Sequence, residues 1–596
     1  CIALIALLIP TKIPLKNWPL QVIFYSLGLF LFSVITSIFF SFDRYESLRE
    51  FFLLGGALII FMKSFSLFES PKTLDRFFWW LLGGTVLFSL YGLYIFMGAG
   101  PLFRLGSVFY QQNAFAGFML PSLFFVVGNM LYASTIKKRI LWATVGIFLF
   151  TTFFFTFARG AALALSGAFL IVSLLLQWPV RRWLRAASIL IVVGGVSGVF
   201  VLGLFNAKIT SSQGSIGSLP NTPITHPSQI FEAETNEDNG MTARFRYLYD
   251  AGRIFVHHPV TGVGWGAFGD AATRYRETLK NYTTDPHNII ARAFVELGLL
   301  GGLALFSFLV VMIFMIFKIL RYFRNSDREL IVFVVSGSFL ALFFQNLVNA
   351  DWMFPSNLFL FWIIAGMVVW FYSIATALPI GKPILPFQEQ FIVGWSFLVL
   401  VVGFITVIAH TSFTNASERV FERDIAGGLF AYQTAVRFNP LNPLYRRDLA
   451  LLYLELAPRA SDPKMRNRYL AASLTEIESG LRMKPHDPYL LFLRGRAHIL
   501  MGDIRRGEAS LQQALREDSL MLLVAYRDLS NIYFQKKEYQ AVASLIQPIL
   551  EVYSREAFGS ILWINPYKED AKKDIADLWV RFGLAKIGLK DEAGAK

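Results

Sequence analysis

Long apolar runs are the feature that most constrains this chain, because they fill most of its first 411 residues. A helix rises 1.5 Å per residue, so crossing the hydrocarbon core of a bilayer takes about 20 mainly apolar residues. Runs of that length, or close to it, lie at 21–42, 51–66, 77–98, 113–133, 140–157, 160–178, 187–206, 289–318, 329–349, 357–376 and 390–411. The sequence therefore predicts an all-α fold, a polytopic transmembrane helical bundle of about 11–12 spans.

The composition excludes a soluble protein and a nucleic-acid binder. Hydrophobic residues make up 55% of the 596 residues, whereas soluble domains are about 45–50% apolar. The formal net charge is +14, but the basic residues gather in short loops between apolar runs, as expected for cytoplasmic loops. The single cysteine, Cys1, allows no internal disulfide. We interpret the apolar opening stretch as the end of a truncated first helix, with a lipidated Cys1 as the alternative.

Three basic clusters set the expected orientation. They lie at 137–139, 181–185 and 318–328, and each should face the cytoplasm. Strict alternation of the spans then places the loops 99–112, 207–288 and 350–356 on the outer face, together with everything after residue 412. We therefore divide the chain into a membrane domain, 1–412, with a large outer loop at 207–288, and a C-terminal domain, 413–596.

Two arginine-bearing stretches lie at the outer ends of predicted spans. Arg104 precedes the carboxamides of Gln112 and Asn113, where a span begins, and Arg159-Gly160 forms a tight outer turn. A planar guanidinium binds phosphate oxygens bidentately, so either arginine could hold a phosphorylated substrate. An arginine at a helix end can also extend to the lipid headgroups without further function.

A third polar stretch ends the large outer loop. Arg244 and Arg246 lie in a segment whose helical spacing suits an interfacial amphipathic helix. The glycine run at 262–266 that follows matches a dinucleotide-binding fingerprint only superficially, because no strand precedes it. His257 and His258 are adjacent and point apart on a helix, so we expect no metal site there.

The fourth polar stretch places a histidine where the outer loop meets an apolar helix. His287 is followed by Asn288 and then by glycines at 298 and 301. An imidazole titrates near neutral pH and can accept a proton, although a histidine at this position can also be a helix cap or an interfacial residue. The glycines would let another helix approach closely. Arg292 and Glu296 lie four residues apart and should pair within the apolar phase.

These motifs resemble, in order, those of the O-antigen ligase and polymerase superfamily over about residues 100–370. The motifs are the Arg-Gly turn at 159–160, the arginine segment at 244 followed by His-Pro-x-x-Gly-x-Gly, and His-Asn-x9-Gly-x-x-Gly at 287–301. Leu248 departs from the aromatic residue of many relatives, and Tyr249 beside it can substitute. The resemblance implies a metal-independent glycosyltransferase without a cofactor. It would move a glycan from a polyprenyl (undecaprenyl) diphosphate carrier to a hydroxyl acceptor such as lipid A-core.

The resemblance also implies roles for individual residues. His287 would be the catalytic base, and arginines would bind the carrier diphosphate. The proposed diphosphate ligands are Arg159, Arg244, Arg246 and Arg104, and the supporting residues are Asn288, Asn113, Gly298 and Gly301. The implied location is the bacterial inner membrane, with the site and the C-terminal domain on the periplasmic side.

The C-terminal domain is charged and repetitive. The segment Asn439–Pro443 recurs in form at Lys484–Pro488, and Glu517-Asp518 holds the equivalent position further on. This pattern resembles tetratricopeptide repeats and predicts a helical-repeat solenoid. Such a solenoid would offer a surface for an envelope protein partner, although an array that serves packing alone is also compatible with the pattern.

Several functions share these features. A polysaccharide polymerase or a protein O-oligosaccharyltransferase would use the same groups with a different acceptor, which could be a glycan, a glycolipid or a protein. A polysaccharide transporter or flippase would place its polar residues near the bilayer midplane, whereas here they gather at one outer face. An envelope scaffold would rely on the repeats alone.

Overall fold

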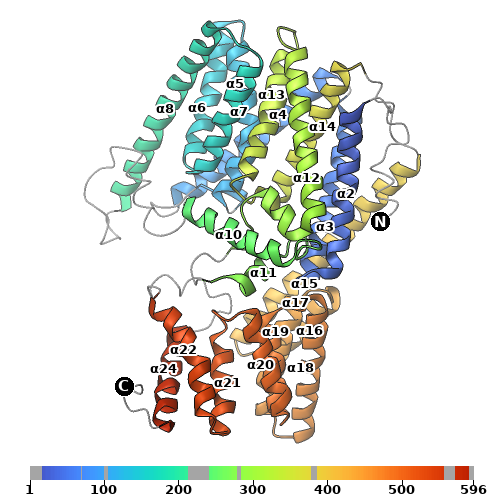
Figure 1. Ribbon diagram of the computed structural model, residues 1–596. Coiled ribbons are helices and arrows are strands. Elements are labelled where there is room, and N and C mark those ends of the chain that lie inside the picture. Colours follow the sequence, from blue (N-terminus) through green and yellow to red (C-terminus); the bar gives the residue numbers. More distant parts are fainter. Residues whose placement is uncertain are drawn as a thin grey trace.

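The computed structural model describes residues 17–68, 70–98, 105–109, 111–212, 241–277, 283–377, 386–555 and 571–589. Within these ranges every regular element is a helix, which confirms the all-α prediction. Each predicted apolar run falls mainly within one helix (Figure 1). These helices are α2 (Trp18–Phe40), α3 (Arg44–Leu67), α4 (Pro71–Gly98), α5 (Gln112–Tyr132), α6 (Ile136–Phe154), α7 (Arg159–Leu175), α8 (Val180–Ser212), α12 (Ile289–Tyr322), α13 (Glu329–Asn346), α14 (Pro355–Ala375) and α15 (Pro386–Phe421).

Eight helices in the described part of the chain are long and apolar enough to cross a membrane. The sequence predicts more spans because it counts three further runs. Helix α7 has only 17 residues, α6 opens on three basic residues at 137–139, and α3 carries four charges between 44 and 50. Charged residues at a helix end shorten the part that can lie in hydrocarbon. The protein is a multi-pass membrane protein in which these three helices complete the bundle.

An irregular layer covers one end of the bundle (Figure 1). It contains α10 (Met241–His257), as expected for the arginine segment, and the short α11 (Phe268–Tyr275). The side chains of Phe245, Tyr249 and Val256 on α10 are exposed, which suits a helix lying at a membrane surface. The other side of this layer packs on the bundle through Ile254 and Phe268, which are fully buried.

The glycine run binds this layer to α12 through a break in that helix. At Gly298 the backbone has φ 71° and ψ −170°, which no regular helix adopts. The break allows the carbonyl oxygens of Val295 and Glu296 to accept from Val263 N at 3.1 Å and from Gly264 N at 3.0 Å. A Cβ atom at position 298 would lie 2.2 Å from the carbonyl oxygen of Val260. Gly298 therefore admits a loop and not the neighbouring helix that the sequence predicts.

Gly301 does allow a close helix approach. A Cβ atom there would lie 3.0 Å from the Cβ of Ser33 on α2, and α2 packs along α12. The two glycines of the motif thus serve different contacts, one with the loop that follows α10 and one with a membrane helix.

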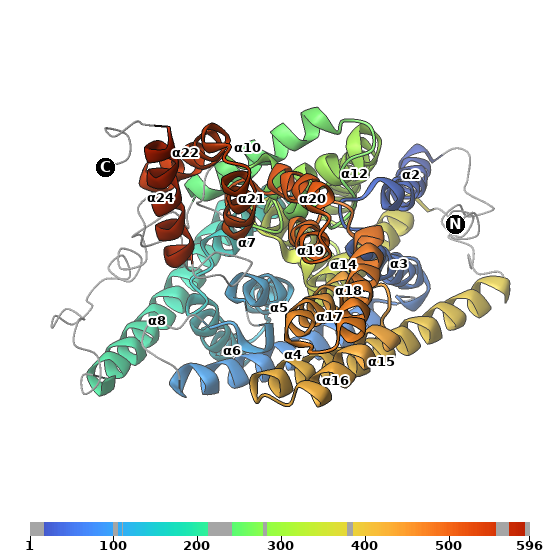
Figure 2. The same cartoon turned by 90° about the horizontal axis from the view of Figure 1, so that it is seen from below.

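The C-terminal helices lie beneath the same end of the bundle (Figure 1), and seen from below they cover much of that face (Figure 2). Helix α15 packs on α16 and runs without a break across the predicted boundary at 412–413. Successive helices then pack on one another, and their assignment to tetratricopeptide repeats stays a prediction. They are α16 (Ile425–Phe438), α17 (Pro443–Leu456), α18 (Pro463–Met483), α19 (Pro488–Leu500), α20 (Ile504–Glu517), α21 (Leu523–Gln535), α22 (Tyr539–Arg555) and α24 (Ala571–Gly588).

Candidate functional site

A hydrogen-bonded turn presents His287 immediately before α12. Asp285 Oδ1 accepts from the backbone N–H of His287 at 2.7 Å, and His287 has a φ of 56°. Asn288 is the helix cap, because its Oδ1 accepts from the N–H groups of Ile290 and Ala291 at 3.0 Å. Its Nδ2 donates to Leu347 O at 3.0 Å, which ties the turn to the end of α13. His287 is therefore not the cap, and its ring is available for another role.

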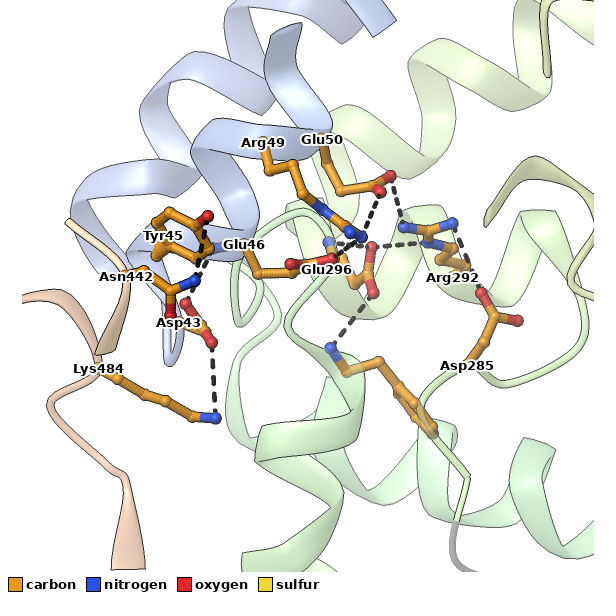
Figure 3. Close-up of polar contacts among 12 residues, drawn as sticks. Asp43, Tyr45, Glu46, Arg49, Glu50, Asp285, Arg292, Glu296, Asn442 and Lys484 are labelled. Carbon is orange, nitrogen blue, oxygen red and sulfur yellow. Dashed lines mark hydrogen bonds and ion pairs between the residues drawn. The ribbon is translucent and has the colours of Figure 1, made fainter. Parts of the chain in front are cut away.

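A buried ion cluster includes Asp285 and so stabilises the turn that presents His287 (Figure 3). Arg292 Nε lies 2.9 Å from Glu296 Oε2, which confirms the predicted pair. The same guanidinium lies 3.2 Å from Glu50 Oε2 on α3 and 3.5 Å from Asp285 Oδ2, and its face packs 4.4 Å from the ring centroid of Trp265. All four ionic side chains are at most 5% exposed. Buried charges are costly unless paired, so this cluster should hold Asp285 rigidly.

The imidazole of His287 lines a cavity of about 400 Å³. The other lining residues are Gln111, Thr283, Thr284, Asp285, Ala350, Met353 and Phe354. The ring stacks on Tyr247 of α10 with 5.3 Å between centroids. Its Nδ1 is buried and makes no hydrogen bond in the described part of the chain. Burial lowers the pKa of His287 below its usual value, so the imidazole is neutral at neutral pH and can accept a proton.

Arg244 lies beside this cavity on α10. Its Nη2 donates to Asn349 Oδ1 at 3.0 Å. Burial is the main cause that lowers the pKa of His287, and the nearby Arg244 charge lowers it further. Burial lowers the pKa of the Arg244 guanidinium, which stays protonated because its usual value is so high. Arg246 is two residues further along α10, so it projects from a different face of the helix.

Arg159 is the first residue of α7, and its side chain is exposed. The turn that carries it lies against Asn349, because a Cβ atom at Gly160 would lie 2.9 Å from Asn349 Nδ2. Asn349 therefore contacts both the 159–160 turn and Arg244. Arg159 also borders a cavity of about 620 Å³ between α6, α7 and α8, lined by Phe153, Phe154, Phe157, Ala158, Ala162, Leu163, Gly194, Gly198 and Val201. Arg104 lies outside the described residues.

Asn113 contributes through its backbone. Its carbonyl oxygen accepts from Gln345 Nε2 at 3.3 Å, which joins the start of α5 to the end of α13. Gln345 belongs to a polar run that continues through Asn349 to Asp351, all of them buried. Burial raises the pKa of the Asp351 carboxyl well above its usual value.

Sequence reasoning missed this polar run between α13 and α14. The signal was present, because four carboxamide or carboxyl side chains at 345–351 separate two apolar spans. It also missed Tyr247, whose stacking on His287 brings α10 together with the turn before α12.

The two adjacent histidines of the outer layer have separate partners. His257 Nδ1 lies 2.8 Å from Arg253 O, and His258 Nε2 lies 2.9 Å from the hydroxyl of Tyr275. Among the described residues, no group of three or more His, Cys, Asp or Glu side chains is placed to hold a metal ion.

Fold and site together define a multi-pass membrane protein with a histidine cavity and arginines at one face of its bundle. The model of the O-antigen ligase family matches residues 143–306, a segment that includes Arg159, Arg244 and His287. This match confirms the predicted resemblance to O-antigen ligases over that segment of the chain.

One curated relative extends the comparison. The chain is 23% identical over 266 residues to the teichuronic acid biosynthesis protein TuaE of Bacillus subtilis (strain 168), which covers 44% of this chain and 51% of that protein. The chain thus spans about half the length of this relative. A crystal structure of MamA protein is matched with 13% identity over 32% of this chain and 86% of that one, with a TM-score of 0.24.

Proposed function

We propose that this protein is a membrane glycosyltransferase of the O-antigen ligase type. It transfers a glycan from a polyprenyl, in bacteria undecaprenyl, diphosphate carrier to a hydroxyl acceptor. The observation that carries the proposal is the imidazole of His287, which lines a cavity beside Arg244 and has a pKa lowered by burial. Such an imidazole can take the proton of an acceptor hydroxyl.

In the proposed reaction the acceptor oxygen attacks the anomeric carbon of the glycan while His287 takes the hydroxyl proton. The bond between that carbon and the carrier diphosphate breaks, and the diphosphate leaves with the bonding electrons. Arg244 and Arg159, both next to Asn349, stabilise the charge of the leaving group. Arg246 and Arg104 are further proposed ligands of the diphosphate. The proposed reaction requires no metal ion.

The apolar cavity beside Arg159 suits the isoprenoid tail of the carrier. It lies among three membrane helices, and its lining is almost entirely apolar apart from the arginine. A lipid whose tail occupies this cavity would place its diphosphate near Arg159. This arrangement favours an enzyme acting on a lipid-linked donor over a transporter, whose polar site would lie at the bilayer midplane.

The acceptor distinguishes the related activities. The name of the relative TuaE supports a role in polysaccharide assembly, which includes a polymerase that extends a growing chain as well as a ligase to lipid A-core. The purified protein should be reconstituted with a lipid-diphosphate-linked glycan and offered lipid A-core, a free oligosaccharide or a protein. Transfer to one acceptor with release of the carrier diphosphate supports the proposal. Movement of intact lipid across the membrane without bond cleavage would identify a flippase instead.

The outer face should be the periplasmic face of the inner membrane. The basic clusters at 137–139, 181–185 and 318–328 lie at the opposite end of the bundle from α10 and the C-terminal helices. A phosphatase reporter fused after residue 412 or inserted near residue 225 should therefore be active, and one fused after residue 183 should be inactive. Cytoplasmic signals at either of the first two positions would contradict this orientation.

The pH dependence of transfer should report the environment of His287. A base is active when neutral, and burial lowers the pKa of His287, so the acid limb of the rate profile should have its midpoint below about 6.5. Removing the Arg244 charge should raise the pKa of His287, so Arg244→Gln should move that midpoint to higher pH. Profiles of kcat/KM for both proteins test this, and a downward shift in Arg244→Gln would contradict it.

A further inference from the structure

The C-terminal helices make a half-buried ionic contact with the membrane part of the chain. Lys484, in the turn between α18 and α19, lies 2.7 Å from Asp270 on α11. It also lies 3.5 Å from Asp43 in the turn between α2 and α3, and 3.5 Å from Asp487 (Figure 3 shows the contact with Asp43). Its side chain is 20% exposed. One cation thus joins three elements that lie far apart in the sequence.

A second ionic contact lies at the other end of α11. Both carboxylate oxygens of Asp518, in the turn between α20 and α21, accept from Arg276 Nη2 at 2.8 Å. The side chain of Arg276 is 7% exposed and that of Asp518 is fully buried. Between these two contacts, Thr273 Oγ1 donates to the carbonyl oxygen of Glu517 at 3.3 Å. The C-terminal helices therefore hold α11 along its length.

Helix α11 in turn contacts the turn that presents His287. A Cβ atom at Gly269 would lie 2.8 Å from the Cα of Thr284, so the first turn of α11 packs directly on that backbone. Thr283 Oγ1 donates to Asp285 O at 2.8 Å, and Asp285 accepts from His287. Because α11 has only eight residues, it is too short to be stable alone and depends on what packs around it.

We propose that Lys484 and Asp518 are positioning residues for the His287 turn, acting through α11. This inference rests on the proposed function for its catalytic readout, and it assigns the C-terminal helices a role at the site besides any recruitment of partners. The membrane side also contacts α11, because Glu296 Oε1 accepts from Phe268 N at 3.2 Å. Helix α11 is thus held by the membrane helices on one side and by the C-terminal helices on the other.

Two substitutions isolate the contacts. Lys484→Met removes the cation and keeps a long apolar side chain. Asp518→Asn keeps Oδ1, which also accepts from the N–H groups of Leu520 and Met521. It removes the charge and the Oδ2 acceptor of Arg276 Nη2. Lys536→Met is the matched control, because Lys536 pairs with Glu508 at the surface of the C-terminal helices and away from α11.

The two variants should lower kcat by roughly 10–100-fold with little change in donor KM, since a displacement of about 1 Å can cost up to about 10²-fold. Hydrogen–deuterium exchange of the full-length protein in detergent should show faster exchange at 283–292 in both variants, and unchanged exchange in α2 and α14. The control should match the wild type in both measurements. Gly269→Ala, which disturbs the same contact from within α11, should reproduce the faster exchange.

The exchange measurement tests the positioning role of Lys484 and Asp518 separately from the proposed function. Faster exchange at 283–292 in a protein that shows no transfer at all would support the positioning and contradict the proposed function. Unchanged exchange in both Lys484→Met and Asp518→Asn would overturn the positioning, whatever their activity. A general rise in exchange that includes α2 and α14 would also overturn it, because the contacts would then stabilise the whole fold and not this turn.

Discussion

Replacing His287 with alanine should lower turnover by about 10²–10⁴-fold, the usual contribution of a positioned general base. Binding of the lipid carrier should stay close to that of the wild type, because His287 acts on the acceptor and the arginines hold the donor. The defect should therefore appear in kcat with little change in donor KM. Single-turnover transfer and binding of a fluorescent carrier analogue to the purified protein measure the two effects separately.

A matched control is His410→Ala, since His410 is exposed on α15 and does not line the cavity. This variant should transfer at the wild-type rate. Full transfer by His287→Ala would remove the base from the mechanism. Loss of carrier binding in that variant would instead show that His287 holds the donor.

Replacing Arg244 or Arg159 with lysine should lower transfer clearly, although less than removing the charge does. Lysine keeps the positive charge but loses the planar fork that binds two phosphate oxygens at once. At Arg244 the substitution also alters the hydrogen bond to Asn349 Oδ1. We expect kcat to fall by about 10²–10³-fold in the alanine variants, as for loss of one preorganised donor, and by about 10-fold or more in the lysine variants. Transfer kinetics with saturating acceptor provide the measurement.

Arg185→Lys is the control for this series, because Arg185 is exposed at the opposite end of the bundle, near the start of α8. Its activity should match the wild type. Lysine variants of both Arg244 and Arg159 with wild-type activity would show that these arginines only reach toward the lipid headgroups.

The sequence predicts the helices well because each span is a local pattern. Apolar runs of about 20 residues leave the backbone little choice inside a bilayer. The i, i+4 spacing of Arg292 and Glu296 likewise predicts a contact within one helix. The same local view counts α3 and α6 as spans without weighing the charges at their ends.

What the sequence does not predict is the set of contacts between distant segments. Glu50 on α3 joins Arg292 across 242 positions, and no periodicity links them. The break at Gly298 is hidden because a glycine within an apolar helix is also compatible with close helix packing. The folded structure explains the break, because the loop at 260–264 packs against α12 at this point.

The candidate site likewise contains residues that the sequence predicts and contacts that it does not. Motif order singles out His287, Arg159 and Arg244, but the carboxamide that contacts both the Arg159 turn and Arg244 comes from Asn349 in another loop. The ionic contacts of Lys484 and Asp518 also depend on folding, since they join the C-terminal helices to α11. A pattern along the chain carries no information about such docking.

The most direct test of the central claim is transfer by the purified, reconstituted protein in the presence of EDTA, with mass spectrometry of both products. We predict that glycosylated acceptor and released carrier diphosphate appear in equal amounts and that EDTA leaves the rate unchanged. If EDTA abolishes transfer and added metal ion restores it, a cation and not Arg159 and Arg244 stabilises the diphosphate. If carrier diphosphate is never released, the protein does not cleave the bond that the proposed reaction requires.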